Sequence, residues 1–172
     1  MISDIDVIIR LLLIALLSGL IGIEREYHSR PAGMRTNVMV GIGSTLMTLA
    51  SIQTFALFPT AQNADPARIS AQLVVGIGFI GAGVILRRGG RQVVGLTTAA
   101  TMWVVCGLGI AVGMGLYTEA LVASALVFVT LFLLTPIVMK IRSIAPKKYA
   151  VLAEPKDDND DDDDKGDEEE DD

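Results

Sequence analysis

Five long apolar stretches, separated by short polar segments, account for most of this chain. Hydropathy places them near Ile5–Ile23, Asn37–Phe58, Ile69–Leu86, Thr98–Leu116 and Ala120–Ile141. Each is about as long as a helix needs to cross a bilayer at about 1.5 Å per residue. The pattern predicts an all-α fold, a polytopic transmembrane bundle of about five spans. The third stretch is the shortest, so a re-entrant segment there, which would leave four spans, is the alternative.

Basic residues are distributed unevenly among the polar segments. Those after the first, third and fifth stretches are Arg25, Arg30, Arg35, Arg87, Arg88, Arg91, Lys140, Arg142, Lys147 and Lys148. Only Arg10 and Arg68 belong to the opposite side. The positive-inside rule therefore predicts an N-terminus outside and a C-terminus in the cytoplasm, as in a multi-pass protein of the plasma membrane.

Composition and charge divide the chain into two parts. The 172 residues are 51% hydrophobic with a mean hydropathy of +0.52, which favours a membrane protein of one domain. Residues 154–172 carry fourteen acidic and two basic side chains, whereas the rest of the chain has a basic excess. We predict a transmembrane domain over residues 1–145 and a disordered acidic cytoplasmic tail over residues 146–172. The tail either solubilises the chain or attracts cations and the basic cytoplasmic loops.

Glycines recur at helical spacing in the third and fourth stretches. The third stretch contains the run GIGFIGAGVIL, and at 100° per residue its glycines fall on two opposite faces. Small residues let helices approach closely in lipid, so we expect neighbours on both faces of this helix. Accordingly, Gly78→Leu should disrupt the bundle more than Ile77→Leu. The predicted packing glycines are Gly76, Gly78, Gly81, Gly83, Gly109 and Gly113.

Three of these glycines also spell G-x-G-x-x-G, the pattern of a dinucleotide site. That site requires a preceding strand and an acidic residue about 20 positions later. No Asp or Glu lies between Asp65 and Glu119. We therefore interpret the glycines as packing residues.

Polar residues of the predicted outer end lie at the start of the first and third stretches. They are Asp6, Arg10, Asp65, Arg68 and Gln72. An arginine about one turn inside the membrane is costly unless it is paired or extends to the headgroups. We expect Arg10 to pair with Asp65 and Asp6 with Arg68; extension of Arg10 to the headgroups is the alternative.

At the predicted cytoplasmic end, Glu24 and Glu26 could supply oxygen ligands to magnesium. Arginines flank both carboxylates, so ion pairs that tie one loop to another are the competing interpretation. The chain has one histidine, His28, which is more typical of an interface than of a ligand site.

The middle of the predicted spans lacks ionisable side chains. The polar or polarisable residues there are Ser18, Ser44, Thr45, Thr48, Cys106 and Thr130. Ion pumps and proton-coupled carriers need ionisable groups at this depth, which favours a scaffold or regulator over a transporter. With a single histidine and no Ser-His-Asp set, we expect no enzymatic activity and no cofactor.

Five blocks of sequence, in the same order, resemble the MgtC/SapB family of membrane proteins. The blocks are GIERE at Gly22–Glu26, RPAGMRT at Arg30–Thr36, DPARISAQ at Asp65–Gln72, GIGFIGAGVIL at Gly76–Leu86 and GLTTAATMWV at Gly95–Val104. The polar residues that this resemblance marks as functional are Glu24, Arg25, Glu26, Arg30, Arg35, Asn37, Asp65, Arg68, Gln72, Thr97 and Thr98.

The resemblance implies an integral membrane protein of magnesium or stress homeostasis that acts by helix contacts on other membrane proteins. The ATP synthase is a candidate partner by this resemblance, beside the lipid bilayer, magnesium and a second copy of the chain; nucleic acid is not expected. The alternative function is an oligomeric magnesium transporter or channel with Glu24 and Glu26 at its mouth. Longer members of the family carry a small α/β domain after the last span, where this chain has its acidic tail.

Overall fold

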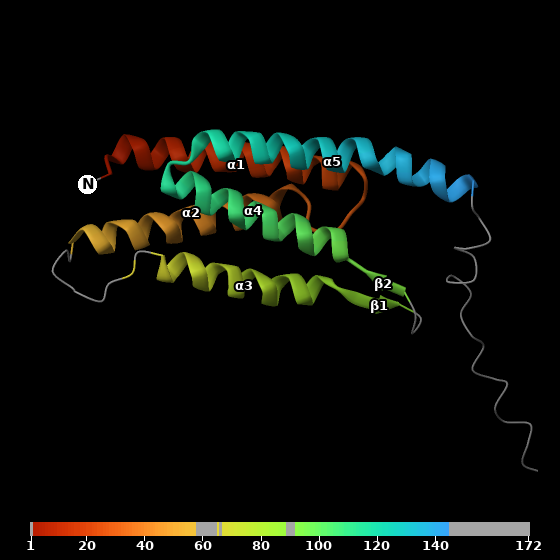
Figure 1. Cartoon of the computed structure of the whole chain (residues 1–172), viewed down its shortest axis with the longest axis horizontal. Helices are drawn as coiled ribbons and strands as arrows, with labels where there is room; N and C mark the ends of the chain where they lie inside the picture. The colour runs from red at the N-terminus through yellow and green to blue at the C-terminus, as the bar shows by residue number, and fades with distance from the viewer. Residues whose placement is uncertain (1, 58–64, 66, 89–91, 145–172) are drawn as a thin grey trace, which may run out of the picture.

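The computed structural model describes residues 2–57, 65, 67–88 and 92–144 and shows a bundle of helices (Figure 1). The helices are α1 (Asp4–Tyr27), α2 (Met34–Leu57), α3 (Arg68–Val84), α4 (Leu96–Met114) and α5 (Tyr117–Ile144). A short antiparallel hairpin, β1 (Leu86–Arg88) and β2 (Gln92–Val94), joins α3 to α4 and pairs Leu86 with Val94. The all-α prediction is confirmed. The predicted acidic tail lies outside the described residues.

Four of the described helices, α1, α2, α4 and α5, are long and apolar enough to cross a membrane, while α3 is a shorter apolar helix of 17 residues. At about 1.5 Å per residue α3 measures about 26 Å. It is one continuous helix beside α4, and its two ends lie at opposite ends of the bundle (Figure 1). This arrangement favours a fifth span over a re-entrant segment.

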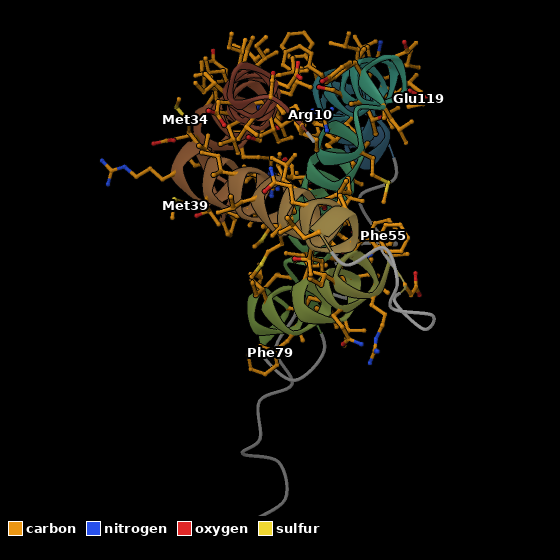
Figure 2. The ribbon with its side chains drawn as sticks, turned by 90° about the vertical axis from the view of Figure 1, so that its left-hand side faces the viewer. Arg10, Met34, Met39, Phe55, Phe79 and Glu119 are labelled. Carbon is orange, nitrogen blue, oxygen red and sulfur yellow. The ribbon has the colours of Figure 1, made fainter. Side chains whose placement is uncertain are left out.

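Helices α1, α2 and α4 form the centre of the bundle. The most extensive interfaces join α2 to α1 and to α4, whereas α3 packs mainly on α4, and α5 packs on α1 and α4. Ile14, Ile21, Val105 and Val112 are fully buried between these helices. The outer surface is apolar as well; Phe79 on α3 is 84% exposed and points away from the other helices (Figure 2). Such a surface suits lipid tails.

Glycines with positive φ mark both ends of α4. Gly95 has φ +92° and precedes the helix, in close approach to the Val84 carbonyl oxygen at the end of α3. Gly115 has φ +84° and ends it, and the Leu116 N–H donates to the Ala111 carbonyl oxygen over 2.9 Å. Left-handed backbone of this kind favours glycine. The turn at Gly115 lets α5 begin only two residues later, at Tyr117.

Only some of the predicted packing glycines contact neighbouring helices. A Cβ on Gly109 would lie 2.7 Å from the Gly41 carbonyl oxygen, and one on Gly113 would lie 2.7 Å from the Thr48 Cβ. A Cβ on Gly81 would lie 3.5 Å from the Ala99 Cβ, which is an ordinary contact distance. Gly41 on α2 was not among the predicted packing glycines, although a Cβ built there would lie 2.9 Å from both Ile14 Cγ1 and Ser18 Oγ. On α1, a Cβ on Gly22, also not predicted, would collide with the Met34 Cα, so tight approaches occur on α1, α2 and α4.

The expectation of close neighbours on both faces of α3 is wrong for the single chain. Nothing lies within 4 Å of a Cβ built on Gly76, Gly78 or Gly83, because α3 is peripheral and packs through one face. That face contains Ile77, which is buried. The expected order of Gly78→Leu and Ile77→Leu therefore has no basis in the contacts of this chain.

Candidate functional site

Two oppositely charged side chains are buried at the end of the bundle that carries most of the basic residues. Glu24 and Arg25 belong to the last turn of α1 and are 6% and 5% exposed. The Arg25 Nη2 donates to Thr98 Oγ1 on α4 over 3.0 Å, and Arg25 Nη1 lies 3.9 Å from Glu24 Oε2. Arg25 therefore ties the end of α1 to the start of α4.

The Glu24 carboxylate is also close to the imidazole of His28, one helical turn further on. His28 Nδ1 lies 3.0 Å from Glu24 Oε1 and 3.0 Å from the Glu24 carbonyl oxygen. Among the described residues, no donor hydrogen-bonds to the other carboxylate oxygen of Glu24, Oε2. Arg25 Nε likewise has no acceptor there. This cluster of Glu24, Arg25, His28 and Thr98 is named here the charged cluster. Its Glu24–Arg25 ion pair joins neighbours in sequence, so the loop-to-loop ion pairs of the arginine interpretation stay a prediction, and the contact between α1 and α4 is the hydrogen bond from Arg25 to Thr98.

The structure does not bring Glu24 and Glu26 together. Two residues apart on a helix, they point about 200° away from each other. Glu26 is exposed, and its Oε2 accepts the N–H of Met34 over 3.2 Å at the start of α2. In the described ranges, no group of three His, Cys, Asp or Glu residues could hold a metal ion. Magnesium binding by the two carboxylates stays a prediction.

Asn37 holds the loop between α1 and α2. Its side chain is fully buried, and Nδ2 donates to the carbonyl oxygens of Ala32 over 2.6 Å and Gly33 over 3.0 Å. Ala32 has a left-handed backbone with φ +56°, which these hydrogen bonds help to hold. Arg30 and Arg35, near either end of this loop, are exposed. Of the two predicted threonines, Thr98 is buried and Thr97 is exposed.

At the opposite end of the bundle, Arg10 has partners other than the predicted Asp65. Its Nη1 donates to the Gly113 carbonyl oxygen over 2.6 Å, and its Nε donates to the Tyr117 hydroxyl over 3.0 Å. The guanidinium carbon lies 5.8 Å from the centre of the Tyr117 ring. Figure 2 shows Arg10 between α1 and α5. Arg10 thus stabilises the turn after α4, because a cation near a helix C-terminus and an arginine over an aromatic ring are both favourable.

The remaining predicted outer residues are not drawn together. Asp65 Oδ1 accepts the N–H of Ala67 over 2.8 Å, at the start of α3. Arg68 and Gln72 are exposed on α3, and Asp6 hydrogen-bonds with Ser3 at the start of α1. The expected Asp6–Arg68 pair is therefore absent as well among the residues described here, because each carboxylate contacts groups close to it in sequence.

Replacing Arg10 tests its role at the end of α4. Arg10→Leu should lower the free energy of unfolding by about 2 kcal/mol, since it leaves the Gly113 carbonyl and the Tyr117 hydroxyl without their charged donor. Tyr117→Phe removes one hydrogen bond and should cost about 1 kcal/mol or less. Unfolding of the purified protein in mixed micelles measures both. If neither variant measurably lowers the free energy of unfolding, Arg10 extends to the headgroups instead.

Buried hydroxyl groups form a seam along α2 through the centre of the bundle. Ser44, Thr45, Thr48 and Ser51 are at most 4% exposed. Thr45 Oγ1 donates to the Gly109 carbonyl oxygen over 2.9 Å, whereas Thr48 donates to the Ser44 carbonyl oxygen of its own helix. Since α4 packs directly on this seam through Gly109 and Gly113, the hydroxyls serve helix packing.

The fold and these sites define a multi-pass helical membrane protein. Comparison with known sequences gives its family. The MgtC family model matches residues 11–140, and the chain belongs to the MgtC family.

Relatives of this chain include proteins with three different names. It is 38% identical to protein SapB of Bacillus subtilis (strain 168) over 140 residues, which are 80% of this chain and 60% of SapB. It is 43% identical to the putative magnesium transporter YhiD of Escherichia coli (strain K12) over 128 residues, 73% of this chain and 59% of YhiD. It is 41% identical to protein MgtC of Salmonella typhimurium (strain LT2) over 137 residues, which are 80% of this chain and 56% of MgtC.

The chain therefore spans less than two thirds of the length of these relatives. No solved structure matches it significantly.

Proposed function

We propose that this chain acts in magnesium or stress homeostasis as a non-enzymatic protein that contacts other membrane proteins through its helices. Its membership of the MgtC family and the printed name of YhiD, a putative magnesium transporter, support the link to magnesium. The ATP synthase is one proposed partner, by family resemblance. The plasma membrane is the proposed location.

The observation that carries the contact mechanism is the bare face of α3. Gly76 and Gly83 share this face and have open space where a side chain would lie, although glycine in a helix costs about 1 kcal/mol relative to alanine. Within the chain these positions are not used for packing. A partner helix could approach the backbone of α3 there, as small residues allow in lipid.

Chemical crosslinking in the native membrane, followed by purification of the full chain, tests this proposal. We expect membrane proteins to co-purify with the wild type and to be lost with Gly76→Leu combined with Gly83→Leu. The bundle itself should tolerate these changes. Ala125→Leu, at an exposed position of α5, is the matched control. Identical crosslinked proteins in all three preparations would contradict the proposal.

The alternative function is an oligomeric magnesium transporter or channel. In its favour are the name of YhiD and the hydroxyl seam of α2. Against it, the tight approach of α4 to α2 leaves no room for an ion beside Gly109 in the single chain. Conduction would have to follow an interface between copies.

A further inference from the structure

A cavity of about 480 Å³ lies in the loop that joins α1 to α2. Its lining residues include Ser29, Arg30, Arg35 and Thr36, together with Glu26. This cavity is named here the basic pocket. Its volume is in the range of small-molecule sites, about 300–1,000 Å³.

The charges of the basic pocket are not balanced within the chain. Neither Arg30 nor Arg35 forms an ion pair with any residue that the structure describes. Glu26 is the one carboxylate in the lining, and its Oε2 already accepts the N–H of Met34. Two guanidinium groups therefore remain available to an anion.

Further hydrogen-bond donors surround these arginines. Ser29 and Thr36, which carry hydroxyl groups, are also lining residues. The pocket also adjoins the N-terminus of α2, whose own first turn contains no acidic residue and where the Glu26 carboxylate of α1 accepts the Met34 N–H. The first N–H groups of a helix have no acceptor within it and favour a negative charge. Arginine forks and helix N-termini are the groups that bind phosphate oxygens in proteins.

The shape of the pocket is fixed by the fold. Ser29 and Ala32 both have left-handed backbone, with φ +51° and +56°. The Arg30 N–H donates to the Arg25 carbonyl oxygen over 2.9 Å, and the buried Asn37 side chain holds the Ala32 and Gly33 carbonyls. A loop held in this way loses little conformational entropy when a ligand binds.

We propose that the basic pocket binds a phosphate group, with Arg30 and Arg35 as its cationic ligands. The pocket lies where two membrane-crossing helices end, which is the depth of lipid headgroups. The phosphate is therefore either the phosphodiester of an anionic lipid or a free phosphate ion. This site is independent of the proposed contacts of α3.

Native mass spectrometry of the full chain in detergent tests the proposal, with phosphatidylglycerol, phosphatidylcholine and inorganic phosphate as probes. We expect phosphatidylglycerol to bind more tightly than phosphatidylcholine, which carries no net charge. Arg30→Gln combined with Arg35→Gln should weaken phosphatidylglycerol binding about tenfold or more, because it removes two charge-assisted contacts. Arg68→Gln, an exposed arginine at the other end of the bundle, is the matched control and should change nothing.

The probes separate the two sources of phosphate. Displacement of the lipid by millimolar inorganic phosphate would identify the free ion as the ligand, and retention of the lipid would identify the headgroup. The melting temperature reports whether each variant is folded. If the double variant is unstable, Arg35→Lys replaces it in the binding measurement, because lysine keeps the positive charge but lacks the forked N–H donors of the guanidinium. Equal binding of the two lipids, or full affinity in the folded arginine variants, would overturn the proposal.

Discussion

Gly109→Leu should unfold or severely destabilise the bundle. A leucine at this position of α4 would place its Cβ within 2.7 Å of the Gly41 carbonyl oxygen and in collision with the Ser44 side chain. Backbone cannot yield as a flexible side chain can, so α2 and α4 would have to separate and lose the Thr45 hydrogen bond as well. Overpacking of a tight core typically costs about 1–3 kcal/mol, and we expect Gly109→Leu to reach or exceed the upper end.

The same helix offers a matched control. Gly107 lies two residues before Gly109, and nothing lies within 4 Å of a Cβ built there. Gly107→Leu should be neutral or stabilise the helix by up to about 1 kcal/mol, because leucine is the better helix former. Unfolding of both variants in mixed micelles measures the difference. Similar stabilities of the two leucine variants would contradict the packing of α4 on α2.

Glu24→Leu should lower the free energy of unfolding by about 3 kcal/mol or more. The change removes the carboxylate from the charged cluster and leaves the buried Arg25 guanidinium with Thr98 as its remaining partner. Removing one partner of a buried ion pair is strongly destabilising because the other charge stays buried. The double change Glu24→Leu with Arg25→Leu should recover part of the loss, since both charges are then gone.

Glu26→Leu is the control for this prediction. Glu26 is exposed and contributes one hydrogen bond, to the Met34 N–H, so its loss should cost about 1 kcal/mol or less. Thermal unfolding in detergent compares the four proteins. The interpretation of the charged cluster fails if Glu24→Leu is no more harmful than Glu26→Leu.

The helices themselves were predictable because span length and hydropathy follow directly from the thickness of a bilayer. The predicted first span, Ile5–Ile23, ends four residues before α1 does at Tyr27. The extra turn contains Glu24 and Arg25, whose charges end a hydropathy window although the helix continues and buries them. Hydropathy measures transfer to lipid and cannot register an ion pair inside the protein.

The partners of individual side chains were less predictable. Glycine density singled out Gly76, Gly78 and Gly83, but density does not tell which helix is central and which is peripheral. Gly41 was missed because it lies in a stretch whose glycines form no dense run. Arg10 was paired by charge with Asp65, whereas a carbonyl oxygen and a tyrosine hydroxyl are its acceptors. Such uncharged acceptors leave no signal in the charge pattern.

The central claim is that the chain acts through contacts with other membrane proteins and carries no magnesium itself. Purified full-length protein, reconstituted in liposomes that enclose a magnesium-sensitive dye, tests this claim most directly, with a divalent-cation ionophore as the positive control. We predict magnesium entry no faster than in protein-free liposomes. Rapid entry that Glu24→Gln abolishes, while the folded Glu26→Gln variant retains it, would contradict the claim.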